Sequence, residues 1–568
     1  MSVEHALAKY RQWLNDSLID EDTRSELESL RGNDKEIEDR FYRDLEFGTG
    51  GLRGVIGAGT NRMNRYTVAQ ATQGLAQFVK ATASGAPSVA IAYDSRHQSP
   101  EFALEAALVL AGNGVKAYVF ESLRPTPELS FAVRHLGATG GVVITASHNP
   151  PEYNGYKVYG SDGGQLVPRD AERVLAEIQK VDALSKVKRM DRAAAEAEGL
   201  LIWIGAEVDE AFVQAVAATS LHPDVVKSVS DRFHILYTPL HGAGNVSVRS
   251  VLKRIGFEHV HVVPEQELPD PNFSTVKSPN PEEREAFTLA LAMAKETSAD
   301  ILIGTDPDCD RMGAVVQNDK GEFVVLNGNQ AGAVMAYYVL SSLKERGELP
   351  DNGVLIKTIV TSEMGAVIAR DFGVHTIDTL TGFKYIGEKM TEFERSGQYR
   401  FLFGYEESYG YLAGTYCRDK DAVLASMLIC EAAAFYKSQG KTLYDVLQEL
   451  YRRYGYFQEQ LESRTMKGKD GLENIKAIME DWRQSPPESV VGVPVVSVKD
   501  YSKGIDGLPA ENVLKFTLAD DSWFCLRPSG TEPKIKMYFG VTGTSGDDAS
   551  GRLERVRAEV MTRIDRFQ

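Results

Sequence analysis

Three acidic side chains stand at alternate positions in one short segment: Asp306, Asp308 and Asp310. In an extended backbone this spacing puts the three carboxylates on one side of the chain. Carboxylate oxygens are hard ligands that favour Mg²⁺ over zinc. An EF-hand is excluded, because Arg311 stands where its turn glycine belongs and Gln317 where its bidentate glutamate belongs. An ordinary acidic turn would leave three carboxylates repelling one another, so the sequence predicts a magnesium site.

Ser147 follows an apolar strand in the segment 145–150, which reads Thr-Ala-Ser-His-Asn-Pro. A corner between strand and loop can present a hydroxyl clear of the sheet. An isolated serine at such a corner usually makes only a local turn, and His148 alone is weak evidence. No Gly-x-Ser-x-Gly elbow surrounds Ser147, which disfavours a hydrolase triad. A serine nucleophile near a divalent metal and basic residues suits phosphoryl transfer.

Two segments have the composition of anion-binding loops. Residues 527–532, Arg-Pro-Ser-Gly-Thr-Glu, combine a guanidinium with two hydroxyls and a flexible glycine backbone. Residues 47–54 are rich in glycine and contain Arg53, but they lack the Lys-Ser/Thr ending of a nucleotide-binding loop. Either segment alone could be an ordinary turn. Elsewhere, Glu406 and Ser408 could bind neighbouring sugar hydroxyls or form a solvated acidic turn.

A threefold repeat predicts the elements that position these side chains. Each repeat runs from an apolar strand through a helical segment to a second and a third strand. The first strands are 88–94, 233–238 and 353–358, and the third strands are 141–145, 300–304 and 399–403. The third strands run into the polar loops 145–150, 304–311 and 404–410. Short apolar strands between helices are typical of parallel sheets whose strand C-termini share one edge, so we expect one composite site.

Length and composition limit the function classes. A chain of 568 residues is too long for one core; alternating strands after about residue 455 predict a smaller α+β domain, and the first 40 or so residues predict amphipathic helices. The formal charge, 63 − 80 = −17, disfavours binding to nucleic acid or anionic membranes. Four cysteines without CxxC spacing fit a reducing compartment. With no signal peptide and no apolar run of about 18 residues, we expect a cytoplasmic protein.

Five motifs in order make the chain similar to the α-D-phosphohexomutase superfamily, in particular its phosphoglucomutases. They are residues 48–53, 145–150, 306–311, 404–408 and 527–531, and together they span nearly the whole chain. The resemblance implies an α/β fold: three topologically similar domains with mixed or parallel sheets and a C-terminal α+β domain, arranged around a central cleft. The expected domains are 1–205 with the phosphoserine loop, 206–322 with the metal loop, 323–453 with the sugar loops and 454–568 with the phosphate loop.

The resemblance also implies the roles at the transferring phosphate. Ser147 would carry the phosphate and bind Mg²⁺ together with Asp306, Asp308 and Asp310. The phosphoserine would phosphorylate the free hydroxyl of a hexose monophosphate to give glucose 1,6-bisphosphate, and the other phosphate would then return to the serine. Four basic residues would surround this phosphate. His148 or Lys157 would move the proton, while Arg53 and Lys420 would supply charge.

Further residues match the family's substrate contacts. Glu406 and Ser408 would bind the sugar's O3 and O4, which stay equivalent when the bisphosphate turns over in the site. Thr381 and Gly382 resemble the remaining sugar loop, and Arg311 is a further expected substrate contact. The phosphate that is not reacting would be held by Arg527, Ser529, Gly530 and Thr531.

These features favour interconversion of glucose 1-phosphate and glucose 6-phosphate, with small phosphosugars as partners and a monomer or homodimer as the assembly. Glu-Glu-Ser at 406–408 is the glucose type, whereas the segment 48–64 and Tyr405 resemble a subgroup that includes phosphopentomutases and a glucose-1,6-bisphosphate synthase. Mutases of mannose or pentose phosphates and a bisphosphate synthase are therefore alternatives. A binding protein without turnover is disfavoured, because Ser147 and the acidic triad are both present.

Overall fold

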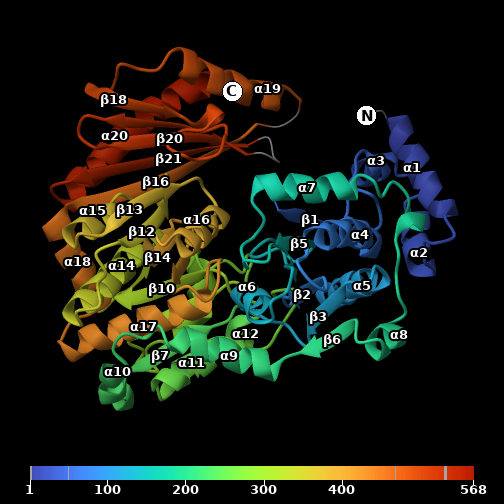
Figure 1. The fold of residues 1–568 in the computed structure, drawn as a ribbon. Coiled ribbons are helices and arrows are strands. Elements are labelled where there is room, and N and C mark those ends of the chain that lie inside the picture. The colour runs from blue at the N-terminus through green and yellow to red at the C-terminus, as the bar shows by residue number, and fades with distance from the viewer. Residues whose placement is uncertain (1–2, 49, 467–468, 530–533, 568) are drawn as a thin grey trace.

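The computed structural model of the protein describes residues 3–48, 50–466, 469–529 and 534–567 (Figure 1). Three helices open the chain: α1 (Val3–Asn15), α2 (Glu21–Ser29) and α3 (Asp34–Phe41). The rings of Tyr10 and Trp13 meet Phe41 edge-on at centroid distances of 5.8 and 5.7 Å. Trp13 also meets Tyr66 of the first domain at 5.5 Å. The predicted helical start is confirmed, and it packs on that domain.

The first three sheets share one strand order. In each, the first strand of the repeat lies between the third and the second, and all three are parallel. The triplets are β4 (Gly140–Ile144), β2 (Ser88–Tyr93) and β3 (Lys116–Phe120); β9 (Ile301–Thr305), β7 (His234–Thr238) and β8 (His259–Val262); and β14 (Arg400–Glu406), β12 (Gly353–Thr358) and β13 (His375–Thr379). The predicted threefold repeat is confirmed.

Further strands at the edges make these sheets mixed. They are β1 (Gly51–Val55), β5 (Tyr153–Tyr159) and β6 (Leu201–Ile204) in the first sheet, β10 (Met312–Gln317) and β11 (Phe323–Leu326) in the second, and β15 (Gly410–Ala413) in the third. β11 begins one residue past the expected boundary at 322 and pairs with β10 of the second sheet. The sequence predicts a loop from residue 404, but β14 continues to Glu406, because Tyr405 and Glu406 pair with Tyr411 and Gly410 of β15.

Helices cover the three sheets. In the first domain they are α4 (Arg65–Thr82), α5 (Ser99–Gly112), α6 (Thr126–His135), α7 (Pro168–Ile178) and α8 (Arg192–Ala197). In the second they are α9 (Ala206–Ala217), α10 (Pro223–Val229), α11 (Gly244–Ile255), α12 (Pro264–Glu267) and α13 (Thr288–Met293). In the third they are α14 (Gly328–Glu345), α15 (Met364–Asp371), α16 (Phe383–Ser396), α17 (Ala422–Ser438) and α18 (Leu443–Tyr454).

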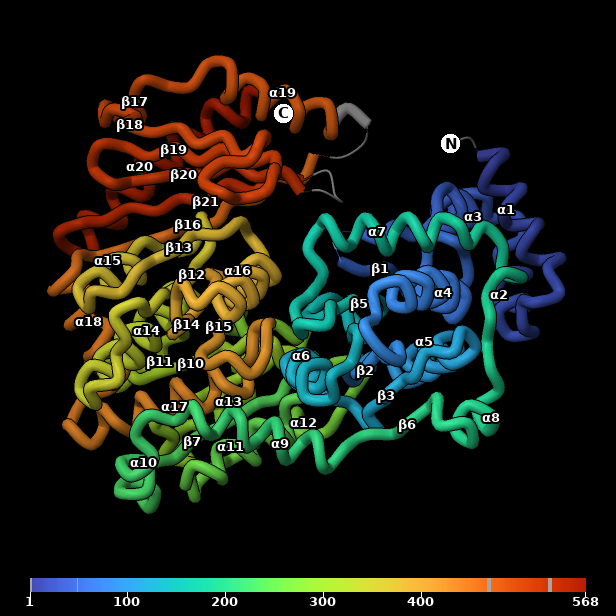
Figure 2. The backbone as a smooth tube through the Cα atoms, in the orientation of Figure 1, coloured from blue at the N-terminus to red at the C-terminus, as the bar shows by residue number. Residues whose placement is uncertain are grey.

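The fourth domain has an antiparallel sheet in the order β16–β21–β20–β19–β18–β17. Its elements are β16 (Tyr456–Thr465), α19 (Lys469–Gln484), β17 (Ser489–Val490), β18 (Val493–Asp500), β19 (Leu514–Leu518), β20 (Trp523–Pro528), β21 (Lys534–Gly543) and α20 (Gly546–Ile564). The predicted C-terminal α+β domain is confirmed. The chain enters it from α18 into β16 (Figure 2). Gly455, between these two elements, has a φ of +107°.

The hydrophobic cores divide the molecule unequally. One core runs through the second and third domains and reaches the first, and α17 lies within it against α11, β9 and β15. The fourth domain has a core of its own. It meets the third through a smaller cluster in which Ile359, Leu380 and Tyr385 pack with Tyr501 and Trp523. The first three domains are therefore more tightly joined than the fourth.

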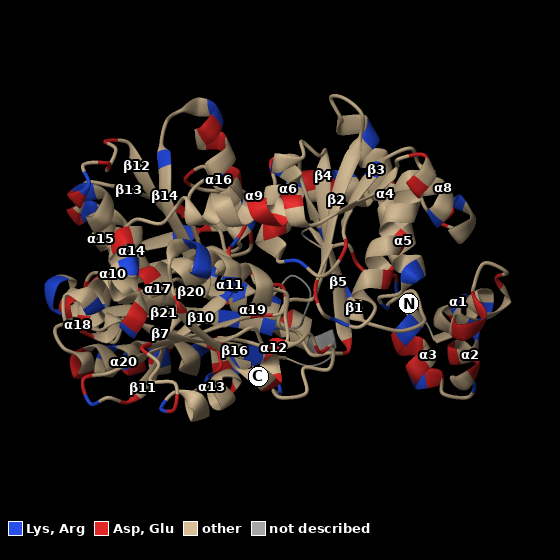
Figure 3. Cartoon of the chain, turned by 90° about the horizontal axis from the view of Figure 1, so that it is seen from below, with Lys and Arg blue, Asp and Glu red and all other residues tan. Residues whose placement is uncertain are grey.

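The charged residues, the apolar character of the helices and the cysteines are further features of the fold. Figure 3 shows acidic and basic residues interspersed over the helices, with acidic residues prominent on α1 to α3. In the described ranges, no helix combines the length and apolar character that a membrane crossing needs. All four cysteines are buried thiols.

Candidate active site

Ser147 lies in the turn after β4, and its hydroxyl points toward the second domain. Its backbone N–H donates to Thr145 Oγ1 at 2.8 Å. Its φ of +52° is in the left-handed region, which costs a non-glycine residue about 1–3 kcal/mol and persists only where the surroundings hold it. Ser147 Oγ donates to Asp306 Oδ2 at 2.7 Å. The predicted nucleophile and the first metal ligand therefore meet across two domains.

Arg96 binds the backbone of the turn that contains Ser147. Its buried guanidinium donates to four backbone carbonyl oxygens of the loop, among them those of Ser147 and Asn149, both at 2.5 Å. Asp94 lies 3.2 Å from Arg96 Nε and accepts the hydroxyl of Thr145 at 2.6 Å. Because this pair ties both ends of the turn together, it provides a physical cause for the strained Ser147 backbone.

The three aspartates lie between β9 and β10, each at most 1% exposed. One carboxylate oxygen from each lies within 4.8 Å of the others. Asp306 Oδ1 accepts the backbone N–H groups of Asp310 and Arg311 at 3.1 and 3.0 Å, so the loop closes on its first carboxylate. The Oδ1 atoms of Asp308 and Asp310 are buried and have no hydrogen-bond partner among the described residues. Buried carboxylates with unused oxygens fit a hard divalent cation.

Two lysines bring positive charge from the first and third domains. Lys157 Nζ, on β5, lies 2.9 Å from Asp308 Oδ2 and 3.5 Å from Asp310 Oδ2. Lys420 Nζ lies 3.0 Å from Asp310 Oδ2. Burial lowers the pKa of each ammonium group, but the carboxylates outweigh it, so both lysine pKa values are raised and both side chains stay charged. Three domains thus meet at one set of aspartates.

The aspartates differ in their electrostatics. Burial raises the pKa of Asp306, and the neighbouring carboxylates of Asp308 and Asp310 raise it further. Burial also raises the pKa of Asp308, but Lys157 more than compensates and holds it below its usual range. Asp306 is therefore the carboxylate that most needs a compensating positive charge, and it is the one that contacts the serine.

His148 and Arg53 lie at the same loop. His148 Nδ1 is 3.3 Å from Ser147 Oγ. Burial first, then Arg311 and Arg53, lower the pKa of the imidazole to about 3, so the ring is neutral near pH 7. Arg53 donates to the side chain of Asn149 at 3.1 Å. The residues expected around the transferring phosphate are therefore together.

The sugar-binding candidates gather at the end of β14. Glu406 is 5% exposed, and its Oε1 accepts the N–H of Gly382, whose φ is +121°, at 2.9 Å. Burial raises the pKa of Glu406 to about 7, although Lys420 lowers it. Thr381 Oγ1 is buried with no hydrogen-bond partner in the described part of the chain. Ser408 is half-buried in the turn that joins β14 to β15.

Arg311 follows the aspartates and faces both the metal loop and a second acidic group. Its Nη1 donates to Glu282 Oε1 at 2.6 Å, and its Nε lies 3.9 Å from Asp310 Oδ1. Burial lowers the pKa of this guanidinium, and the acidic neighbours, led by Glu282, raise it above its ordinary value. Arg311 is therefore charged beside the site, as a substrate-binding role requires.

The structure describes part of the predicted phosphate loop of the fourth domain. Arg527 Nε, on β20, donates to Glu511 Oε1 at 2.9 Å. The Ser529 backbone N–H donates to the carbonyl oxygen of Lys534 at 2.7 Å. Gly530 and Thr531 lie outside the described residues, so their roles stay predictions from the sequence.

Two lysines outside the sequence motifs add to the charge near Arg527. Burial lowers the pKa of Lys384 to about 8, Glu511 raises it, and Arg527 lowers it. Burial and then Arg527 also lower the pKa of Lys536. A cation whose pKa is depressed by another cation lies in a positive field, which suits the binding of an anion.

Known proteins match most of this chain. Family models described as phosphoglucomutase/phosphomannomutase, alpha/beta/alpha domains I, II and III match residues 44–185, 210–321 and 327–454. The phosphoglucomutase of Staphylococcus haemolyticus is 38% identical over 517 residues, covering 89% of this chain and 91% of the relative. That of Staphylococcus aureus (strain MRSA252) is 36% identical over 564 residues, covering 95% and 96%.

The chain belongs to the phosphoglucomutase/phosphomannomutase family. Solved structures of the family share its fold. One is a phosphoglucomutase/phosphomannomutase family protein from Burkholderia thailandensis, with a TM-score of 0.66, 18% identity and coverage of 92% of this chain and 97% of that one. Another is the Paramecium phosphoglucomutase pp63/parafusin in an open form, with a TM-score of 0.69, 16% identity and coverage of 93% and 96%.

Four residues near the candidate site are not identified by the sequence motifs. Asp94 and Arg96 follow β2, at the same sheet edge as the serine loop, so the strand order alone places them near it. Lys384 lies two residues past Gly382 of the expected sugar loop. Lys536 belongs to β21, and its place beside Arg527 depends on the pairing of β20 with β21, which has no local sequence signature.

Proposed function

We propose that this protein is a phosphoglucomutase that interconverts glucose 1-phosphate and glucose 6-phosphate through a phosphorylated Ser147. The observation that carries the proposal is the 2.7 Å contact between Ser147 Oγ and Asp306 Oδ2. It brings a nucleophile to a buried cluster of three carboxylates, with lysines from two domains beside it. Curated relatives that carry the name phosphoglucomutase support the same activity.

In the proposed first half-reaction, the P–O bond of phosphoserine 147 breaks and a P–O bond to the free hydroxyl of the sugar monophosphate forms. The hydroxyl proton goes to a base beside the nucleophile. His148, neutral and 3.3 Å from Ser147 Oγ, can accept it, whereas the charged Lys157 can donate a proton to the serine oxygen as it leaves. Glucose 1,6-bisphosphate then turns over, and the second half-reaction returns the other phosphate to the serine.

Asp306, Asp308 and Asp310 would hold Mg²⁺ together with Ser147. A bound Mg²⁺ supplies positive charge that offsets the negative charge of the transferring phosphoryl group. Arg53 and Lys420 add charge at this end of the site. Because positioning and charge provide most of the rate in phosphoryl transfer, the preorganised cluster accounts for the proposed chemistry.

The remaining roles concern binding. Glu406 and Ser408 would hold the sugar's O3 and O4, with Thr381, Gly382 and Arg311 as further substrate contacts. Arg527, Ser529, Gly530 and Thr531 would hold the phosphate that is not reacting. One site can then serve both half-reactions, because O3 and O4 exchange places when the bisphosphate turns over.

The test is a coupled assay on glucose 1-phosphate, mannose 1-phosphate and ribose 1-phosphate, with and without glucose 1,6-bisphosphate. We expect the highest kcat/KM with glucose 1-phosphate and stimulation by the bisphosphate. Ser147→Ala, purified in the same way, measures contaminating host mutase and is expected to lose several orders of magnitude in kcat. A preference for mannose or ribose phosphate, or an equally active Ser147→Ala, would overturn the assignment.

A further inference from the structure

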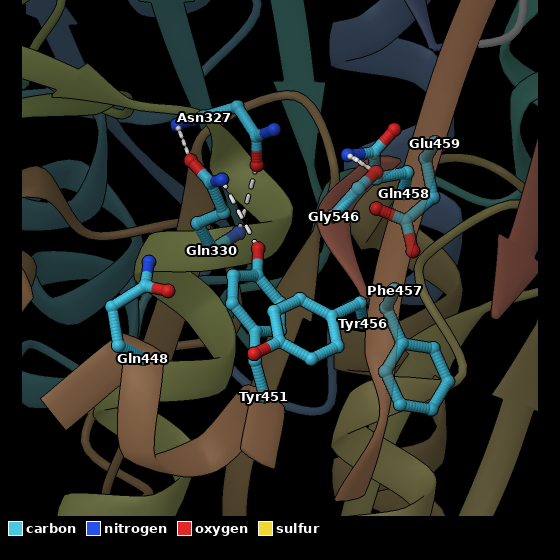
Figure 4. A pocket seen from close by; sticks show the side chains of 9 residues that line it. All are labelled: Asn327, Gln330, Gln448, Tyr451, Tyr456, Phe457, Gln458, Glu459 and Gly546. Carbon is cyan, nitrogen blue, oxygen red and sulfur yellow. Dashed lines mark hydrogen bonds between the residues drawn. The ribbon is translucent and has the colours of Figure 1, made fainter. Parts of the chain in front are cut away.

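A cavity of about 350 Å³ lies where the chain passes from the third domain into the fourth (Figure 4), and its described lining does not include the three aspartates. Its walls come from the start of α14, from α18, from the first residues of β16 and from the start of α20. Its volume is at the lower end of the range found for small-molecule sites. Nothing in the proposed mutase reaction uses it.

The polar side-chain groups of this junction cavity are amides, two phenols and one carboxyl. Gln330, Gln448 and Gln458 line it, together with Glu459. Gln330 Nε2 donates to the hydroxyl of Tyr451 at 3.1 Å, which fixes the orientation of that amide (Figure 4). No Lys, Arg or His is among the described lining residues. The cavity therefore offers donors and acceptors to neutral groups and no counter-charge to a phosphate.

Aromatic surface lies beside these amides. The rings of Tyr451 and Tyr456 stack at a centroid distance of 5.4 Å and an interplanar angle of 21°. Burial raises the pKa of Glu459 to about 7; the hydroxyl of Ser362 lowers it and Glu363 raises it. Near neutral pH the Glu459 carboxyl can thus either donate or accept a hydrogen bond. Hydroxyl groups match such a mixture of donors and acceptors, and the apolar face of a sugar ring matches an aromatic wall.

We infer that the junction cavity is a second ligand site, for an uncharged, hydroxyl-rich molecule of the class of a free hexose or its dimer. The absence of basic lining residues separates it from the catalytic centre, where Arg53, Lys157 and Lys420 gather around the aspartates. A free sugar meets the donors and acceptors of the cavity without burying a charge, whereas a sugar phosphate would bury an uncompensated one.

The position of the cavity couples its ligand to the fourth domain. β16 contributes Tyr456 to the cavity at one end and pairs with β21 along its whole length, from Tyr456↔Gly543 to Thr465↔Lys534. Nine residue steps of strand make this ribbon about 30 Å long. Its far end carries Lys534, next to the phosphate loop. A ligand between α18 and β16 would thus bias the angle of the ribbon and, if the proposed function holds, the KM for sugar phosphate more than kcat.

The test is isothermal titration of the full-length enzyme with glucose and with maltose, in the presence of saturating glucose 1,6-bisphosphate to occupy the catalytic centre. We expect binding of at least one neutral sugar. Gln448→Trp, which fills the cavity, should weaken it at least tenfold, and Glu459→Gln should weaken it with little change in Tm. Gln214→Trp, on the exposed face of α9, is the matched control and should bind as the wild type does.

Three results would overturn the inference: no binding of either neutral sugar, binding unchanged in Gln448→Trp and Glu459→Gln, or tighter binding of glucosamine than of glucose. The binding readout needs no turnover. Sugar binding in a protein that lacks mutase activity would refute the proposed function and support the cavity site. Mutase activity in a protein that binds neither neutral sugar would support the proposed function and refute the cavity site.

Discussion

The two proposed phosphate-binding ends of the site, the transferring end at Ser147 and the holding end at Arg527, are built differently. At the transferring end, Ser147, the three aspartates, Lys157 and Lys420 come from three domains and are locked by buried contacts. At the holding end, Arg527 is paired with Glu511 of its own domain, and that domain has a separate core. A smaller cluster, and a strand entered through Gly455, connect it to the rest.

This contrast indicates that the two ends have different roles. The chemistry needs groups held to within fractions of an ångström, and several domains buried against one another provide that. The loop that we propose holds either of two phosphates would gain from a domain whose angle can change. Mutations at the transferring end should therefore lower kcat, and mutations at the holding end should raise KM.

The largest effect is expected for the metal cluster. Asp308→Asn should lower kcat by about 10³-fold, since it removes a preorganised ligand and an ion pair of Lys157. Chelation of the wild type should abolish activity, and added Mg²⁺ should restore it. Asp319→Asn, at an exposed position, is the control and should stay active. Full activity of chelated enzyme would refute a metal role for the aspartates.

Arg96→Lys should come next, with kcat reduced by about 10²-fold at nearly constant KM. A lysine cannot donate to all four of the carbonyl oxygens through which Arg96 holds the Ser147 turn. Small displacements of a reacting group lower the rate strongly. Steady-state kinetics and the Tm measure the effect, with Arg370→Lys at an exposed position of α15 as control. A raised KM with an unchanged kcat would assign Arg96 to binding rather than to positioning.

Arg527→Ala should raise the KM for glucose 1-phosphate about tenfold and change kcat by less than about threefold. A charged hydrogen bond to phosphate contributes about 1.5–3 kcal/mol, and 1.4 kcal/mol corresponds to a factor of ten. Lys384 and Lys536 would retain part of the positive field. If kcat fell as far as in Asp308→Asn, the proposed difference between the two ends would be wrong.

The smallest effect concerns Glu406, which lies between the two ends. Its folded pKa of about 7 exceeds the ordinary value near 4.3. The folded state therefore binds this proton more tightly, and the resulting stabilisation is complete below about pH 4 and lost as the pH rises through 7. Glu406→Gln should remove this dependence of stability on pH. In the wild type it changes the free energy of unfolding by on the order of 1–3 kcal/mol.

Urea unfolding of the ligand-free protein at several pH values between 5 and 8 measures the Glu406 effect. Glu345→Gln, at an exposed helix position, provides the control and should keep the wild-type slope. Identical slopes in all three proteins would show that the Glu406 carboxyl is not kept neutral by burial.

Sequence and structure agree best where local patterns determine the answer. The threefold repeat, Ser147 and the aspartates could be predicted, because strands and loops follow one another along the chain. Arg96 lies at the predicted sheet edge, but its hydrogen bonds could not be predicted, because they reach carbonyl oxygens more than fifty residues away in the sequence. The extension of β14 to Glu406 depends on pairing with β15, and the charge around Arg527 depends on how the third and fourth domains meet.

The most direct test of the central claim is the intact mass of the protein before and after incubation with glucose 1,6-bisphosphate and Mg²⁺, with peptide mapping. The account predicts the gain of a single phosphoryl group, located on Ser147, and no gain in Ser147→Ala. Phosphorylation at another residue, or an equal gain in the Ser147→Ala variant, would contradict it.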